Sequence, residues 1–297
     1  MKKMLLIVNP WAGMRKVRRY LWEILSIFNQ AGWTVSVHMT QGSADAAQVA
    51  QTMAPQVDLV VCAGGDGTFN EMVTGVLRSG VRVPLGYIPC GSTNDFATSL
   101  KLSSNILQAA RDIVEGSPKS YDIGMFGQRY FSYVASFGAF TRASYATPQN
   151  VKNALGHTAY VLSGISEISQ IRKEHIRIEL PDRVIEGAYL FGAISNSTSM
   201  GGILSLDPGQ VDMGDGLFEL LLVREPKNLV ELHECIHALQ TQTYNCSMLT
   251  FLSTGSLTIH ADPQMPWTLD GEREQGHETV RVENLHHAID LIMREKK

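Results

Sequence analysis

Strand and helix patterns alternate through the first third of the chain. Apart from Asp58, residues 57–63 are all apolar, which is typical of a strand buried on both faces of a parallel sheet. Apolar residues recur at helical spacing between one strand pattern and the next. The expected strands are 5–8, 34–39, 57–63 and 85–88, and the expected helices are 17–28, 44–53 and 69–77. This order predicts a doubly wound α/β domain, because parallel strands need a long crossover between them, usually a helix.

The pattern changes beyond about residue 122. Residues 122–135 predict a hairpin with its turn at Gly127-Gln128, and residues 175–180 alternate polar and apolar side chains as a half-buried strand does. Further strands are expected at 189–194, 217–223, 248–252, 256–260 and 279–282, with one helix at 229–240. Many short strands with a single helix among them predict an antiparallel, β-rich architecture.

These patterns divide the chain into two domains. We expect an α/β domain over residues 1–122 and a β-rich domain over residues 123–283. Helical spacing returns at 288–293. We therefore expect a short helix within a C-terminal tail, about 284–297, that packs back on the first domain.

Composition and charge exclude several classes of protein. The 297 residues include 25 Lys and Arg against 29 Asp and Glu, so the net charge of -4 lacks the basic field of a typical nucleic-acid binder. The apolar run at 4–8 is shorter than the roughly 7 to 15 residues of a signal peptide, and no stretch approaches the ~18 of a membrane span. Four cysteines lie far apart without a Cys-x-x-Cys pair, which indicates reduced thiols in a cytoplasmic protein.

Residues 64–71 read Gly-Gly-Asp-Gly-Thr-Phe-Asn-Glu and lie where a predicted buried strand ends and a helix begins. Glycines at such a turn let backbone N–H groups approach an anion, and the helix N-terminus adds unpaired donors. An aspartate in an anion site is consistent with Mg2+ accompanying a phosphate. The alternative is a plain turn followed by a capping box formed by Thr68 and Glu71.

Two further loops follow neighbouring strands. Residues 89–97 read Pro-Cys-Gly-Ser-Thr-Asn-Asp-Phe-Ala, and residues 9–13 read Asn-Pro-Trp-Ala-Gly. Both would lie at the carboxyl edge of the parallel sheet, where open α/β sheets bind ligands. We therefore expect three loops to converge on one crevice.

Other motifs carry less information. No Gly-x4-Gly-Lys-Ser/Thr or Gly-x-Gly-x-x-Gly motif and no protein-kinase signature is present. His233 and His237 have the spacing of a zinc protease motif, but apolar residues at 229, 232, 236 and 239 indicate an ordinary amphipathic helix. The basic residues Arg15, Lys16, Arg18 and Arg19 are expected to form a solvated face, or else to contact phosphates or an anionic membrane.

The loops 9–13, 64–71 and 91–97 together resemble the catalytic domain of the diacylglycerol kinase family, in particular its soluble bacterial lipid kinases. The Gly-Gly-Asp-Gly-Thr run alone is shared with NAD kinases and, more loosely, with phosphofructokinases. Later stretches similar to family landmarks are Gly201-Gly202, Pro208, Asp215-Gly216 and residues 269–272. The resemblance implies an N-terminal domain that holds MgATP and a C-terminal β-sandwich that helps to bind a lipid acceptor.

The resemblance also implies roles for individual residues. Glu272 matches the general base, and Asp66 would orient metal-bound phosphate or share the role of the base. A structural Mg2+ would take the side chain of Asp215, with Asp95 and Asp122 joining through water. Its other ligands would be the carbonyl groups of Asp212 and Leu217. The implied nucleotide contacts are Asn9, Pro10, Trp11, Ala12, Gly13, Thr40, Gly64, Gly65, Asp66, Gly67, Thr68, Phe69, Asn70 and Ser92. Ser92-Thr93 stands where the family more commonly has Thr followed by a small residue.

From these residues we expect a lipid kinase that uses ATP and Mg2+, acts at a membrane surface, and phosphorylates diacylglycerol as its first-choice acceptor. Phosphoryl transfer depends mainly on positioning and charge stabilisation, so a glycine-rich cradle, a metal ion and one carboxylate are sufficient parts. The open alternatives are another lipid acceptor (a sphingoid base, phosphatidylglycerol or a polyprenol), NAD kinase, and a nucleotide-binding regulator. A homodimer is implied by the resemblance alone.

Overall fold

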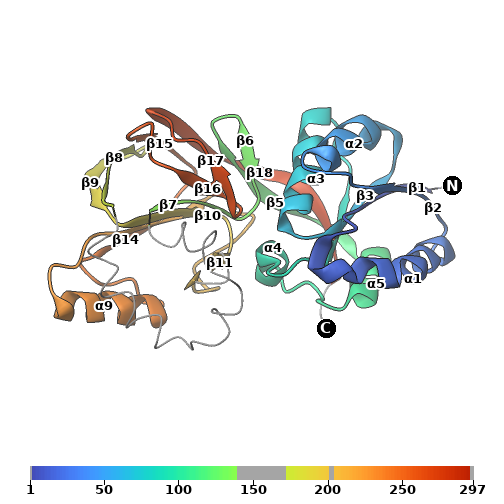
Figure 1. Ribbon diagram of the computed structural model, residues 1–297, viewed down its shortest axis with the longest axis horizontal. Coiled ribbons are helices and arrows are strands. Elements are labelled where there is room, and N and C mark those ends of the chain that lie inside the picture. The colour runs from blue at the N-terminus through green and yellow to red at the C-terminus, as the bar shows by residue number, and fades with distance from the viewer. Residues whose placement is uncertain (1, 139–171, 201–203, 295–297) are drawn as a thin grey trace.

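The computed structural model describes residues 2–138, 172–200 and 204–294, so the Gly201-Gly202 landmark lies outside the described residues. The N-terminal unit has four strands: β1 (Lys2–Val8), β2 (Trp33–Met39), β3 (Leu59–Gly64) and β4 (Leu85–Pro89). They pair in parallel in the order β2-β1-β3-β4 (Figure 1). The parallel sheet predicted from the apolar runs is therefore confirmed.

Helices cover both faces of this sheet. Apolar residues of α1 and α5 form one core with β1 and β3, while those of α2 and α3 form another on the opposite face (Figure 1). The helices are α1 (Lys16–Gln30), α2 (Asp45–Met53), α3 (Asp66–Ser79), α4 (Asp95–Ser99) and α5 (Ile106–Glu115), with 3-10 turns η1 (Ala12–Arg15) and η2 (Ala54–Gln56). The strong amphipathic helix α5 was not among the expected elements.

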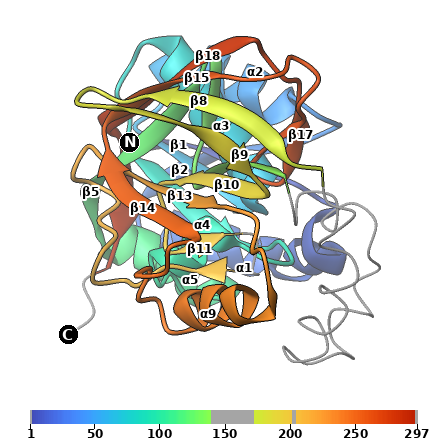
Figure 2. The ribbon, with the colours of Figure 1, turned by 90° about the vertical axis from the view of Figure 1, so that its left-hand side faces the viewer.

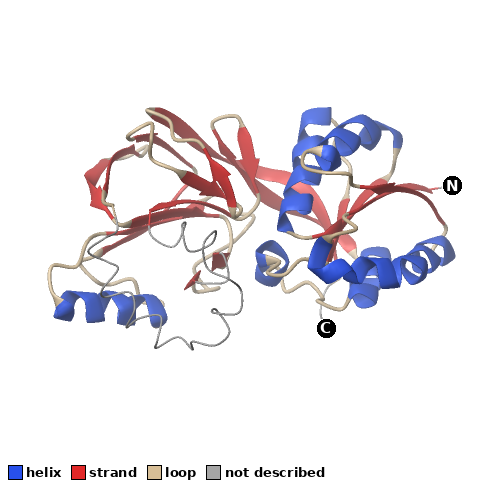
Figure 3. Cartoon of the chain, in the orientation of Figure 1, coloured by secondary structure: helices blue, strands red, loops and turns tan. Residues whose placement is uncertain are grey.

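The second unit is a β-sandwich, and Figure 3 shows how few helices it contains next to the first. One layer is a six-stranded sheet in the order β14-β13-β10-β7-β16-β17. Its strands are β7 (Val134–Gly138), β10 (Phe191–Ser195), β13 (Phe218–Val223), β14 (Leu249–Thr254), β16 (Trp267–Leu269) and β17 (Glu272–Glu274). The helix α9 (Leu229–Gln240) lies below this sheet (Figure 2) and buries Cys235 and Ala238.

The other layer continues the sheet of the first unit. It contains β5 (Ser117–Phe126), β6 (Arg129–Phe131), β8 (Glu174–Glu179), β9 (Val184–Tyr189), β15 (Ser256–His260) and β18 (Thr279–Met293). The path runs β4-β18-β15-β8-β9, so one ten-stranded sheet passes through both units. Trp267 fills the sandwich core between the layers, with its rings 4.8 Å from Phe126 and 5.0 Å from Phe137 between centroids. A two-stranded pair, β11 (Ser199–Met200) and β12 (Leu204–Ser205), lies beside α4.

The expected helix at 288–293 is wrong, because these residues belong to β18. Ile289 and Leu291 are buried, and Leu291 pairs with Leu85 of β4. A short apolar run fits either a buried strand or a helix, so periodicity alone could not decide between them. The segment does lie against the first unit, as a strand of its sheet.

The predicted fold class, an α/β domain followed by a β-rich domain, is confirmed. Two strands, β5 and β18, belong to both units, and their antiparallel pairing joins them. None of the helices in the described ranges combines the length and the apolarity that a membrane crossing needs.

Candidate functional site

The three loops predicted to converge do lie against one another at the carboxyl edge of the parallel sheet. Gly13 has a left-handed φ of +50°, and a Cβ there would overlap the carbonyl oxygen of Cys90. A Cβ on Gly91 would lie 2.7 Å from the Cα of Gly65. Glycine is therefore required at these positions so that the loops after β1, β3 and β4 can touch.

Changing Gly13 to Ala should lower nucleotide affinity and stability together, because the methyl group would push the 9–13 loop away from Cys90. The matched control is Gly32→Ala, since Gly32 is also left-handed at +84° but a Cβ there meets no atom within 4 Å. Both variants carry about 1–2 kcal/mol of backbone strain. Thermal unfolding and nucleotide titration should therefore show a larger loss for Gly13→Ala than for Gly32→Ala. Equal losses would mean that the loop contact is unimportant.

The 64–71 loop opens α3, which begins at Asp66 with Gly65 as its N-cap. No side chain caps this end, so the first backbone N–H groups of the helix are available to an anion. The Thr68 hydroxyl accepts a hydrogen bond from Asn9 Nδ2 at 2.9 Å, and Glu71 Oε1 accepts one from the backbone N–H of Ala44 at 2.8 Å. The alternative capping box is therefore absent, because both of its side chains serve other loops.

Thr40 and Ser92 lie at the same sheet edge. Thr40 follows β2, is buried, and donates its backbone N–H to the carbonyl of Val8 at 2.9 Å. Ser92 is exposed in the loop after β4. Within the 9–13 loop, Pro10 and Ala12 are buried while the Trp11 side chain is exposed. Nucleotide contact by these residues stays a prediction.

Two residues of the 64–71 motif serve the packing of the protein. Phe69 is fully buried and stacks on Tyr87 and Phe96, with ring centroids 4.5 and 4.7 Å away, so its side chain cannot reach a nucleotide. Asn70 instead connects α3 to the second unit. Its Nδ2 donates to the Tyr130 carbonyl at 3.3 Å, and its Oδ1 accepts from the Ser132 hydroxyl at 3.0 Å.

Asp66 joins two of the converging loops. Its carboxylate accepts backbone N–H groups of Asp95 at 3.1 Å and Phe96 at 3.4 Å. Burial, and then the nearby charge of Asp95, raises the pKa of Asp66 to about 6. Asp95 itself is buried and accepts a hydrogen bond from the Ser199 hydroxyl.

This raised pKa predicts an acidic limb in the pH dependence of kcat/KM. Below about pH 6 Asp66 gains a proton and loses the charge that would attract a metal-bound phosphate, so activity should fall. Asp95→Asn should move the limb to lower pH, because it removes the second-largest cause of the raised pKa. A limb that stays in place in Asp95→Asn would contradict this origin.

Asp270 anchors the turn that carries Glu272. Its carboxylate is buried and accepts three backbone N–H groups, those of Ser132 at 2.5 Å, Tyr133 at 2.9 Å and Val134 at 3.0 Å. Burial raises the pKa of Asp270 to about 7, although the three hydrogen bonds oppose the shift. Asp270 has a left-handed φ of +49°, so the carboxylate holds a strained turn in place.

Glu272 lies directly beside the 64–71 loop. A Cβ on Gly67 would lie 3.4 Å from Glu272 Oε1, at ordinary van der Waals distance, so the two residues are direct neighbours. Arg129 holds Glu272 from the other side, with Nη2 2.6 Å from Glu272 Oε2 and Nη1 2.6 Å from Glu274 Oε2. The structure thus brings Glu272 to the start of α3, and Arg129 is a site residue that no sequence signal indicated.

The residues predicted to hold a structural metal lie in the turn before β13. Asp212 Oδ1 accepts the Gly214 N–H at 3.1 Å, and Asp215 Oδ1 accepts the Leu217 N–H at 2.9 Å. The Leu217 carbonyl accepts from Asn284 Nδ2 at 2.9 Å and retains a second lone pair. Asp122 reaches this turn from β5, whereas Asp95 lies beside Asp66.

Glu219, on β13 just after this turn, carries another carboxylate, and sequence reasoning missed it. Its side chain is buried, and its Oε2 has no hydrogen-bond partner among the described residues. Burial, followed by the charges of Asp215 and Asp212, raises the pKa of Glu219 to about 8. Negative charge gathered near one turn favours a hard divalent cation such as Mg2+.

The zinc-protease spacing at 233–237 is not a metal centre in this fold. His233 and His237 are exposed on α9 with ring centroids 6.5 Å apart. In the described ranges no third donor joins them, because the single group of three lies elsewhere. The interpretation as an amphipathic helix is supported by the burial of Cys235 and Ala238.

Comparison with known proteins gives matches over nearly the whole chain. Residues 3–126 match the family model described as "Diacylglycerol kinase catalytic domain", and residues 134–293 match "YegS C-terminal NAD kinase beta sandwich-like domain". A diacylglycerol kinase of Bacillus subtilis (strain 168) is 32% identical over 300 residues, covering 100% of this chain and 98% of the relative. A diacylglycerol kinase of Staphylococcus aureus (strain MRSA252) is 35% identical, covering 98% of this chain and 92% of the relative.

Solved structures share the fold. A diacylglycerol kinase of Bacillus anthracis str. Sterne superposes with a TM-score of 0.75 at 21% identity, covering 99% of this chain and 97% of the other. Another chain from the same organism superposes with a TM-score of 0.80 at 24% identity, covering 99% and 95%. At these identities the likeness concerns the architecture of the two units.

Proposed function

Since this chain belongs to the diacylglycerol kinase family, we propose that it transfers the γ-phosphoryl group of ATP to the hydroxyl of diacylglycerol, giving phosphatidic acid. The observation that carries the proposal is the position of Glu272 Oε1, next to Gly67 at the start of α3. A carboxylate and a phosphate-binding helix end, brought together from two units, are the parts that phosphoryl transfer to an alcohol needs.

The N-terminal unit would bind the nucleotide. The 9–13, 64–71 and 89–97 loops contact one another through their glycines. No side chain caps the N-terminus of α3, so its first backbone N–H groups are open to phosphate. The bond from Asn9 to Thr68 ties the first loop to the helix and would keep the cradle in one shape. Positioning of this kind supplies much of the rate in phosphoryl transfer.

Glu272 would act as the general base. The acceptor hydroxyl gives its proton to the Glu272 carboxylate while its oxygen forms a bond to the γ-phosphorus. The bond between that phosphorus and the bridging oxygen breaks, and ADP leaves with the electron pair. Asp270 holds the turn and Arg129 holds the carboxylate, so both would position Glu272 without touching the substrate.

Mg2+ would have two roles in this proposal. When bound with ATP it supplies positive charge that offsets the charge of the phosphates, and Asp66 is the carboxylate in the cradle that would hold it. A second, structural Mg2+ would be held by Asp215 with the carbonyls of Asp212 and Leu217. The raised pKa of Glu219, to which the charges of Asp215 and Asp212 contribute, supports a cation near these groups.

Association with the membrane surface and a homodimer are both expectations, and the described residues support the first. On α1, the Trp22 side chain is 82% exposed, and Arg18 and Arg19 lie one turn away on the same side. The Arg18 guanidinium lies 5.0 Å from the ring centroid of Trp11, which is also exposed. Aromatic and cationic side chains together are typical of helices that lie on anionic lipid surfaces.

Trp22→Ala should therefore weaken binding to anionic vesicles by about tenfold, because one buried aromatic side chain is worth roughly that much. Val184→Ala removes another exposed apolar side chain, on β9 in the second unit, and should leave vesicle binding unchanged. Cosedimentation with vesicles of phosphatidylglycerol and phosphatidylcholine measures both variants. Equal binding by wild type and Trp22→Ala would exclude α1 as the docking surface.

The acceptor is tested by offering γ-labelled ATP with one acceptor at a time and identifying the product by mass spectrometry. We expect phosphatidic acid from diacylglycerol, and far less product from a sphingoid base, phosphatidylglycerol, a polyprenol or NAD. A phosphorylated lipid other than phosphatidic acid would change the acceptor and keep the lipid kinase. Phosphorylated NAD alone would overturn the proposal.

A further inference from the structure

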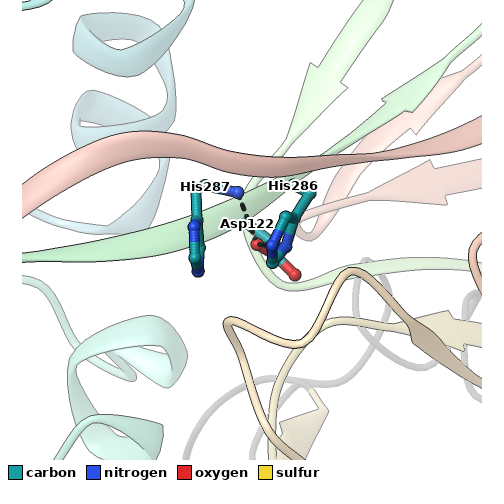
Figure 4. A group of neighbouring side chains, drawn as sticks. All are labelled: Asp122, His286 and His287. Atoms are coloured by element: carbon teal, nitrogen blue, oxygen red, sulfur yellow. Dashed lines mark hydrogen bonds and ion pairs between the residues drawn. The ribbon is translucent and has the colours of Figure 1, made fainter.

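A bulge in β18 places two consecutive histidine side chains on the same side of the strand. The pairing of β5 with β18 changes register between Leu285 and Ile289, and His287 has a left-handed φ of +51°. Consecutive side chains of a regular strand point to opposite faces. Here the rings of His286 and His287 stack with centroids 3.7 Å apart (Figure 4). Strained backbone that gathers polar side chains is characteristic of binding sites.

Both histidines contact the buried carboxylate of Asp122. His286 Nδ1 lies 3.1 Å from Asp122 Oδ1, and the backbone N–H of His287 donates to the same oxygen at 2.7 Å (Figure 4). The other oxygen accepts the N–H of Gly216 at 2.7 Å. Within the described part of the chain, no Lys or Arg forms an ion pair with Asp122. A fully buried carboxylate whose neighbouring side-chain partner is an imidazole, with no Lys or Arg, favours the binding of a cation.

The donor atoms have the spacing and the chemistry of a metal site. One donor atom from each of Asp122, His286 and His287 lies within 4.8 Å of the others, and no other group of three does so in the ranges described. His287 Nε2 forms a hydrogen bond with the Gly214 carbonyl at 3.1 Å, the kind of outer partner that fixes the orientation of a ligating imidazole. The His286 side chain is 52% exposed, so an ion can enter from solvent. Two imidazoles with one carboxylate favour Zn2+, Co2+ and related ions over Mg2+, which prefers oxygen donors alone.

We propose that a divalent transition-metal ion, Zn2+ or a chemical relative, binds between Asp122, His286 and His287. This site differs from the magnesium site proposed at Asp215, which uses oxygen donors and reaches Asp122 only through water. The ion would bind Asp122 directly and join β5 to β18, the two strands shared by both units. Its binding would stabilise that junction, because an ion that binds only the folded chain raises folding stability.

Co2+ is the probe, because its visible absorption reports the number and type of its ligands. The metal-free full-length protein is titrated with Co2+ in a constant excess of Mg2+, and the thermal unfolding midpoint is measured with and without Zn2+. Wild type should bind one Co2+ with a spectrum of mixed nitrogen and oxygen ligation, and Zn2+ should raise its midpoint.

The test variant is His286→Gln with His287→Asn, since Asn tolerates the left-handed backbone at 287. We expect at least about 100-fold weaker Co2+ binding, because even the loss of an outer partner of a ligand typically costs 10- to 100-fold. The matched control, His233→Gln with His237→Gln, also removes two exposed imidazoles, and Asp215→Asn tests the neighbouring magnesium site. Both should bind Co2+ as wild type does.

The outcomes separate the alternatives. Unchanged binding by the His286→Gln, His287→Asn variant, with a metal-free unfolding midpoint equal to that of wild type, would overturn the proposal. Loss of Co2+ in the α9 control, or complete displacement of Co2+ by Mg2+, would also overturn it. Loss of Co2+ binding in Asp215→Asn alone would assign the ion to the magnesium site instead.

Discussion

Replacing Glu272 by Gln should lower kcat by about 10²- to 10⁴-fold, which is the usual contribution of a general base. Gln has the same size and keeps one oxygen near Gly67, but its amide cannot accept the proton of the acceptor hydroxyl. Because ATP would bind to the loops of the first unit, the affinity for nucleotide should stay close to that of wild type. Steady-state kinetics and a nucleotide titration measure the two quantities separately.

The matched control for this variant is Glu274→Gln. Glu274 binds the other nitrogen of Arg129 at the same distance, 2.6 Å, so the substitution perturbs the same arginine without touching the proposed base. We expect kcat close to wild type for Glu274→Gln. Near-normal turnover by Glu272→Gln, or equal losses in both variants, would remove Glu272 from the role of base.

Asp66→Asn should lower kcat by about 10²- to 10³-fold, comparable to the loss of one preorganised charge-stabilising group at an active centre. The variant keeps the shape of the side chain but removes the charge that would hold metal-bound phosphate. It should also abolish the acidic limb near pH 6, because the group that titrates there is gone. Rates measured across the pH range test both statements.

Stability separates this loss of activity from misfolding. The pKa of Asp66 lies above its ordinary value of 3.8, at about 6, so the folded chain holds a proton on it more tightly than the unfolded chain does. The contribution of Asp66 to stability therefore falls as pH rises from about 4 to 6 and stays low above that range. At neutral pH the uncharged Asn should leave the metal-free protein at least as stable as wild type.

The control for Asp66→Asn is Asp58→Asn. Asp58 directly precedes β3, at the end of the strand away from Asp66, and its carboxylate accepts the N–H of Lys3 at 2.7 Å. Its loss should leave both kcat and the acidic limb unchanged. A reduced melting temperature of Asp66→Asn without nucleotide, or an equal loss of kcat in Asp58→Asn, would contradict a specific role for Asp66.

Much of the first unit could be predicted from the sequence because its signals are local. A wholly apolar run such as 59–63 predicts a strand buried on both faces, and the glycines that follow it predict a loop whose backbone groups are exposed to a ligand. Loops after parallel strands meet at one edge of the sheet. The convergence of the three loops follows from that rule without knowledge of any side-chain contact.

The centre that includes Glu272 could not be located from local signals, because distant segments build it. Glu272 reaches Gly67 only because Asp270 binds three N–H groups of residues 132–134, and Arg129 binds from a hairpin far away in sequence. The family resemblance suggested a role for Glu272 but gave no sign of Arg129. Long-range pairing of this kind leaves no periodic pattern in the chain.

A contiguous motif also hides how its residues diverge in space. Phe69 and Asn70 follow Thr68 directly, yet the turn of α3 sends Phe69 into the core and Asn70 toward β6. Secondary structure in the tail is ambiguous in the same way, since the mostly apolar residues 288–293 fit both a helix and the strand β18. In both cases tertiary packing decides what the local sequence leaves open.

Transfer of the γ-phosphate of ATP to diacylglycerol in mixed micelles, measured with Mg2+ and again after chelation, tests directly whether this chain is a Mg2+-dependent diacylglycerol kinase. We expect labelled phosphatidic acid with wild type and Mg2+, and a large loss of product with chelator or with Glu272→Gln. Nucleotide binding by wild type without any label in the lipid would contradict this function.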